Sequence, residues 1–146
     1  MPLKSVTASD VLTSTAAIII EAIAASDITQ GEIVHTSIPA DPLVAPYLDT
    51  VDLADASQAA PESTVRGMAI NAAAAGQRIN IVTKDPELDP GTAVDAGETL
   101  ALSATTPGGM CPDADLGSGH FKTVLGVGIG GNKMHFAPIA AGIATP

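Results

Sequence analysis

The sequence predicts an all-β fold, a compact antiparallel β-sandwich or barrel-like knob with long loops. Short runs rich in β-branched residues recur along the chain and are separated by Gly, Pro and Asp. No window places apolar residues at helical spacing between proper caps. A chain of 146 residues is long enough for one domain with a core and too short for two of ordinary size. We therefore expect one β-rich domain, residues 16–146, preceded by an extended N-terminal arm, residues 1–15.

Seven segments have the composition of strands: residues 18–23, 32–37, 64–70, 78–83, 98–103, 121–129 and 133–139. The first lies in an apolar stretch that resembles a targeting segment, but Glu21 interrupts it, which favours a strand. The alanine-rich residues 71–77 are expected to form a loop or a single turn, because an unsupported helix needs about 12 to 15 residues. Residues 39–62 are rich in Pro and Asp and predict a long irregular excursion, with at most a short strand near residues 47–53.

The apolar residues of this chain are mostly small. They make up 46% of the sequence, but only Tyr47, Phe121 and Phe136 are aromatic and there is no Trp. Because aromatic side chains contribute the most buried area per residue, such a core gains less on folding, and we expect the protein to associate with neighbours.

Charge and cysteine content exclude several classes of protein. The chain has 16 acidic and 6 basic residues, a formal net charge of −10, and its basic residues are scattered singly, which argues against a nucleic-acid partner. Cys111 is the only cysteine, so no intramolecular disulfide or CxxC site can form. No run of about 18 uninterrupted apolar residues indicates a membrane span.

The stretch TVLGVGIGGNKMHF, residues 123–136, contains Gly126, Gly128 and Gly131 in the spacing G-x-G-x-x-G. In a dinucleotide-binding fold this spacing leads into a helix, and an acidic residue follows about 20 positions later. Here Pro138 follows instead, and no Asp or Glu remains in the chain. The pattern therefore predicts a β-hairpin and no bound cofactor.

We expect this hairpin to turn at Gly130 and Gly131, since both residues tolerate positive φ. Counting outward from that turn gives three pairs on the inner face: Val127 with Met134, Leu125 with Phe136, and Thr123 with Pro138. Lys133 and His135 then lie on the other face.

The candidate metal ligands fit no known pattern. His35, His120 and His135 are the only histidines, and the expected register separates His120 from His135 by roughly 20 Å. Asp85, Glu87 and Asp89 alternate like the first ligands of an EF-hand, but the loop has Pro90 where Gly is needed and Ala96 where Glu is needed. A solvated acidic turn is the favoured interpretation, and an irregular calcium site stays open.

Candidate nucleophiles also lack their partners. Ser118 and His120 lie close in sequence to Asp113 and Asp115, but near-adjacent residues on an extended chain cannot converge into a triad. Cys111 has no basic neighbour to lower its pKa. We expect no catalytic, cofactor-binding or metal-binding residues and no enzyme.

Three segments resemble a known family: SDITQGEIV at 26–34, VRGMAINAAAAGQRINIVT at 65–83, and AGETLALSATTPGGMCPDADLGSGHFKTVLGVGIGGNKMHF at 96–136. They contain, in order, I-x-x-G-x-x-V, G-x-A with an alanine-rich turn, G-x-x-x-x-L-S, P-G-G and V-L-G. In this order they resemble the decoration, or cement, proteins of tailed-bacteriophage capsids over residues 26–140.

The resemblance implies a β-rich knob, usually a homotrimer, made in the host cytoplasm and carried on the outer surface of the virion. Its partners would be the major capsid protein and further copies of itself, and it would stabilise the expanded head against the pressure of packaged DNA. Such a protein needs no catalytic residues. This chain departs from the family pattern in its first 25 residues and in residues 39–62, where we place specificity, and residues 1–15 are expected to contact the capsid or a neighbouring copy by strand addition.

A second interpretation is a small β-rich ligand- or carbohydrate-binding module of a surface fibre or adhesin. It predicts exposed aromatic platforms, and the three aromatics of this chain argue against it. An accessory domain of a larger enzyme stays open as a third.

Overall fold

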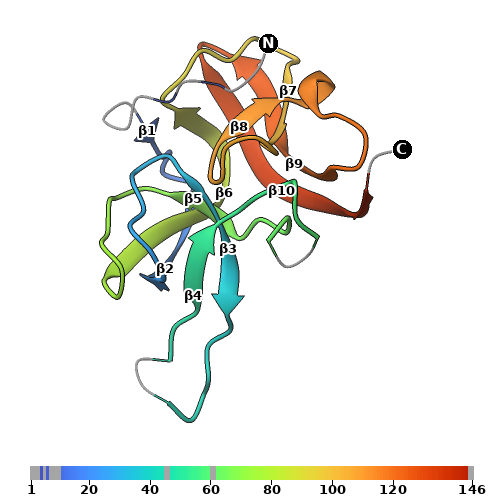
Figure 1. The fold of residues 1–146 in the computed structure, drawn as a ribbon. Helices are drawn as coiled ribbons and strands as arrows, with labels where there is room; N and C mark the ends of the chain where they lie inside the picture. Colours follow the sequence, from blue (N-terminus) through green and yellow to red (C-terminus); the bar gives the residue numbers. More distant parts are fainter. Residues whose placement is uncertain (1–3, 5, 7–10, 45–46, 60–61, 145–146) are drawn as a thin grey trace.

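The computed structural model describes residues 4, 6, 11–44, 47–59 and 62–144, with the backbone alone for residues 141–144. Within these ranges the fold is all-β, as predicted, with ten strands and one short 3₁₀ helix, Asp113–Asp115. Figure 1 shows the strands as two connected groups, one formed by the first half of the chain and one by the second half.

Five strands form a closed ring of pairings, and we call this ring the barrel. They are β2 (Ile18–Ala24), β3 (Ile33–Ile38), β4 (Thr50–Leu53), β5 (Gly67–Ala69) and β6 (Arg78–Pro90). The strand order is β2-β4-β3-β5-β6, and β6 pairs again with β2. The β2–β4 pair is parallel and the other four are antiparallel, so the prediction of an antiparallel fold holds except at this pair.

The long strand β6 also belongs to the second group, which we call the outer sheet. Its C-terminal half pairs with β10 (Lys133–Ala144), which continues through β9 (Phe121–Gly130) and β7 (Thr99–Leu102) to β8 (Met110–Pro112). The two-residue strand β1 (Val11–Leu12) pairs with the same half of β6. One strand therefore joins the barrel to the outer sheet.

Each of the seven predicted segments contains a strand, and the alanine-rich residues 71–77 form turns, as predicted. The differences lie in extent. Strand β6 continues seven residues beyond the predicted end at Thr83 and reaches Pro90. Strands β1 and β8 were not predicted, while β4 lies within the short strand expected near residues 47–53.

Part of the barrel wall, around β5, is buried on both faces. Side chains that point into the barrel are mostly Ala, Val and Ile, such as Ala22, Ala69 and Ile81, because a ring of so few strands leaves little interior space. Neighbouring residues on the same strands, such as Met68 and Val82, point outward and pack against the larger side chains of the outer sheet. The core of small side chains expected from composition is found in the barrel interior. The larger Met, Leu and Phe side chains lie in the other core cluster, between the barrel and the outer sheet.

The described residues of the N-terminal segment contact both the outer sheet and the core. The backbone amide of Lys4 donates to the carbonyl of Met110 on the edge strand β8 over 2.8 Å, and Val11 is buried. A Cβ added to Gly31, where φ is +92°, would lie 2.7 Å from Val6 Cγ1. The glycine thus leaves room for the segment. Most of residues 1–15 lie outside the described ranges, so contact of this arm with a neighbour stays a prediction.

Candidate functional site

The G-x-G-x-x-G stretch forms the hairpin between β9 and β10, so its last glycine leads into a strand, where the dinucleotide motif needs a helix. The predicted register is wrong by one residue. Gly131 (φ +65°) and Asn132 (φ +58°) form the turn, and Gly130 pairs with Lys133. Two consecutive positive φ values are typical of the type I′ turn, whose twist suits a hairpin.

A bulge after Lys133 shifts the expected pairs. Met134 lies opposite Gly128, and Phe136 lies opposite Gly126. The shift turns Val127 outward, opposite His135, where the residue is 41% exposed, although the sequence placed it on the inner face. Leu125, Met134 and Phe136 are buried, as expected for that face.

The first two glycines of the stretch are required by close backbone contacts. A Cβ on Gly126 would lie 2.0 Å from the carbonyl oxygen of His135, and one on Gly128 would lie 1.9 Å from that of Asp95. The spacing therefore reflects two tight contacts and one turn in a hairpin.

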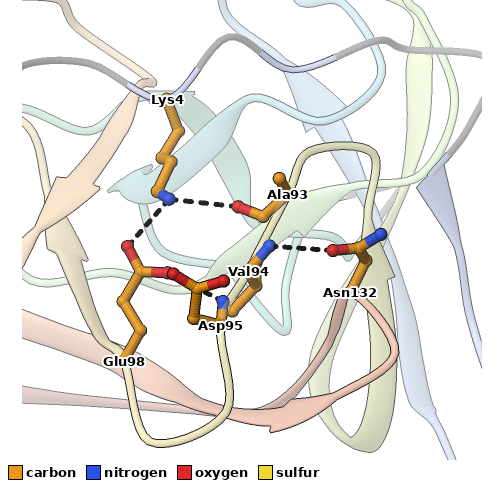
Figure 2. Close-up of polar contacts among 6 residues, drawn as sticks. All are labelled: Lys4, Ala93, Val94, Asp95, Glu98 and Asn132. Atoms are coloured by element: carbon orange, nitrogen blue, oxygen red, sulfur yellow. Dashed lines mark hydrogen bonds and ion pairs between the residues drawn. The ribbon is translucent and has the colours of Figure 1, made fainter.

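A polar cluster holds the β6–β7 loop against this hairpin (Figure 2). Lys4 Nζ lies 2.7 Å from Glu98 Oε1 and donates to the carbonyl of Ala93 over 3.0 Å. Glu98 Oε2 accepts the amide of Asp95 over 3.0 Å, and the amide of Val94 donates to Asn132 Oδ1 over 3.4 Å. Hydrogen bonds from Lys4 and from the Asp95 amide lower the pKa of Glu98 below its usual range. The Glu98 carboxylate thus stabilises the loop through both of its oxygens.

The acidic run at residues 85–89 is part of strand β6, and Asp85 is fully buried, so the solvated turn favoured by the sequence is wrong at this residue. Asp85 accepts hydrogen bonds from the amide of Ser14 over 2.8 Å, from the Ser14 hydroxyl and from the amide of Glu87 over 3.0 Å. Asp89 accepts the amide of Gly91 over 3.0 Å. Two of these three carboxylates already have protein donors.

A pocket of about 80 Å³ brings together Cys111, Asp115 and His120. Burial and then the negative charges of Asp115 and Asp113 raise the pKa of the Cys111 thiol to about 11. His120 accepts the amide of Gly117 on Nδ1 over 3.1 Å. A catalytic cysteine needs the opposite environment, one that favours the thiolate. The pocket has the residue types of a catalytic triad and holds a protonated thiol.

The other candidate residues lie apart from one another. Asp113 forms an ion pair with Lys122 over 2.5 Å, and Ser118 is exposed in the loop between the 3₁₀ helix and β9. The ring of the buried His35 lies 3.2 Å from the carbonyl of Thr36. Among the described residues, no group of three or more His, Cys, Asp and Glu could hold a metal ion.

The loop between β3 and β4 carries the most exposed large apolar residue among those described. Figure 1 shows it extending beyond the rest of the fold at the bottom of the view. Leu43 is 89% exposed, and Ile38, Val44 and Tyr47 are each more than half exposed. Asp41 accepts the amide of Leu43 over 2.8 Å and shapes the turn. We call residues 38–44 and 47–49 the projecting loop.

Two further surfaces could bind a partner. Val127 and Ile129 are 41% and 48% exposed on β9, and we call them the β9 stripe. A hollow of about 270 Å³ lies where β6 passes from the barrel to the outer sheet, and we call it the basic hollow. It is lined by Ile18, Val65, Arg66, Thr83, Lys84 and Pro138. Neither surface could be predicted from the sequence. The β9 stripe depends on the register of the hairpin, and the basic hollow joins residues from distant parts of the chain.

Within the described ranges, no helix has the length and apolar character that a membrane span requires. Comparison with protein-family models, with curated proteins and with solved structures finds no match to this chain.

Proposed function

We propose that this chain is a capsid decoration protein of a tailed bacteriophage. In this proposal it binds the outer surface of the expanded head where major capsid protein subunits meet, acts as a homotrimer and stabilises the head against the pressure of packaged DNA. It is a structural protein of the virion and not an enzyme.

The observation that carries the proposal is the exposure of large apolar side chains at several places, of which the projecting loop and the β9 stripe are two. The projecting loop extends from the barrel, and the β9 stripe lies on the outer sheet. Contiguous exposed apolar surface indicates contact with another protein. A cement protein must join at least two protein surfaces, and two such places provide for that.

The segments that resemble the cement family also contact one another. Ile28 pairs with Ala73, the amide of Gly31 donates to the carbonyl of Ala69, and the amide of Ile33 donates to that of Gly108. These segments therefore form one connected framework in this chain, and the projecting loop lies in the segment where this chain departs from the family pattern.

Stabilisation of the head follows from linkage. A protein that binds the expanded lattice and not the unexpanded one shifts the equilibrium toward the expanded form. Many copies with modest contacts together give a large effect when each one joins neighbouring subunits.

Cosedimentation tests the proposal. The purified protein is mixed with expanded, undecorated capsids and with unexpanded procapsids, both assembled from the major capsid protein encoded in the same genome. We expect saturable binding to the expanded form alone. Absence of binding to either form would refute the proposal, and a positive glycan array would then support the carbohydrate-binding module, whose only well-exposed aromatic here is Tyr47.

A double variant tests the capsid-facing surface. Val127→Ser with Ile129→Ser is expected to weaken binding at least tenfold, since burying each apolar side chain contributes about 1 to 2 kcal/mol. Ile139→Ser is the control, because Ile139 is 71% exposed and belongs to neither the β9 stripe nor the projecting loop. Wild-type binding by the double variant would show that the β9 stripe does not face the capsid.

A further inference from the structure

We propose that the projecting loop of one copy docks in the basic hollow of a second copy. This inference does not rest on the capsid function, because it concerns the protein alone in solution. It names the two surfaces that would meet and the chemistry that would join them.

The projecting loop is both apolar and acidic. Leu43 and Val44 are exposed beside Asp41, and Asp49 lies at the base of the loop. The chain contains no Lys or Arg anywhere between residues 5 and 65, so the loop itself carries no positive charge. A site that binds this loop must therefore offer apolar surface together with positive charge.

The basic hollow offers this combination. Ile18, Val65 and Pro138 supply apolar surface, and Arg66 and Lys84 supply two of the six basic residues of a chain whose net charge is −10. Lys84 has no ion-pair partner among the described residues, and the side chain of Arg66 is 42% exposed, with its Nε 3.6 Å from Asp49 of the same copy.

Most other cations of the protein are already engaged. Lys4, Arg78 and Lys122 pair with Glu98, Glu21 and Asp113 over 2.7, 2.7 and 2.5 Å. Of the two hollow cations, Arg66 is partly engaged by Asp49, and Lys84 is the exposed cation that is left for a partner beside apolar side chains. An acidic, apolar segment fits the basic hollow, and each further copy of this chain carries one.

Each copy carries both a loop and a hollow, and the two are different surfaces. Their contact is heterologous, which generates a ring if the rotation closes and a filament if it does not. Pairing of Asp with Arg and Lys would also offset the mutual repulsion of copies that each carry a charge of −10.

Sedimentation equilibrium of purified variants tests this contact. The wild type is expected to associate, and Leu43→Ser with Val44→Ser in the loop, or Lys84→Glu in the hollow, is expected to weaken association at least tenfold. Lys133→Glu is the control, since Lys133 is an exposed lysine outside the hollow. Equal thermal unfolding of all variants would show that each one folds.

A mixture of the two variants gives the sharper result. The loop variant keeps an intact hollow and the hollow variant keeps an intact loop, so an equimolar mixture should form dimers that neither variant forms alone. The proposal is overturned if the wild type is monomeric, if both variants associate like the wild type, or if the mixture stays monomeric. Because no capsid is present, these results are independent of the capsid-binding test.

Discussion

Replacing Gly128 by alanine should destabilise the protein more than the same change at Gly131. The new Cβ at Gly128 would lie 1.9 Å from the carbonyl oxygen of Asp95 and 2.7 Å from Val94 Cγ1. Ordinary contact begins at 3.4 Å, so β9 and the β6–β7 loop must separate by about 1.5 Å. Two backbone hydrogen bonds of 2.8 Å join β9 to this loop: the amide of Gly97 donates to the carbonyl of Gly128, and the amide of Gly128 donates to the carbonyl of Glu98.

Losing these two bonds costs about 2 kcal/mol, and the overpacking costs about 1 to 3 kcal/mol more. At Gly131 no atom lies within 4 Å of the added Cβ, and only the positive φ opposes alanine, which costs about 1 to 2 kcal/mol. For a chain of this size each kcal/mol lowers Tm by about 2 to 4 °C, so Gly128→Ala should lower it by about 10 °C.

Urea unfolding and calorimetry of the two variants measure this difference. A Gly128→Ala variant as stable as the wild type, or a Gly131→Ala variant less stable than Gly128→Ala, would contradict this prediction. Either outcome would mean that the glycine spacing is not explained by contact with the β6–β7 loop.

Cys111, Lys4 and Gly31 give three further testable predictions. Because the pKa of Cys111 is raised to about 11, its thiol should react with iodoacetamide at pH 8 far more slowly than in urea; equal rates would contradict the buried, protonated state. Lys4→Met should lower stability at neutral pH by up to about 1 kcal/mol. The pKa of Glu98 is lowered in the fold, so its contribution is present above its unfolded pKa and lost as pH falls through the folded one. The deficit of the variant should therefore shrink in acid, and a constant deficit would exclude the ion pair as its cause. Gly31→Ala should cost about 2 to 4 kcal/mol, from its positive φ and its contact with the N-terminal segment, and should speed proteolysis near the N-terminus; unchanged proteolysis would show that the segment is held elsewhere.

The strands were predictable because β-branched runs and turn residues are local signals. The hairpin register was not, since Gly130–Gly131 and Gly131–Asn132 both tolerate positive φ and the sequence offers either turn. The structure has the second turn, with a bulge that places Gly128 against the carbonyl of Asp95. That contact joins residues more than thirty positions apart, and no local pattern indicates it.

The polar clusters show the same limit. Asp and Pro at residues 85–90 predict a turn locally, but Asp85 pairs with Ser14 and the strand around it pairs with β10 near the other end of the chain. Lys4 and Glu98 lie 94 positions apart, so their ion pair has no signature in the sequence. Composition indicated an apolar core of small side chains without showing that it would fill a barrel.

The sharing of β6 between the barrel and the outer sheet has a consequence for the order of folding. The four other barrel strands and the N-terminal half of β6 lie within residues 18–84, so this ring can close while the rest of the chain is still being synthesised. The C-terminal half of β6 then waits for β10, whose first residue is Lys133. Such late, non-local pairing slows folding, and until it occurs the nascent chain presents an open strand edge to other chains.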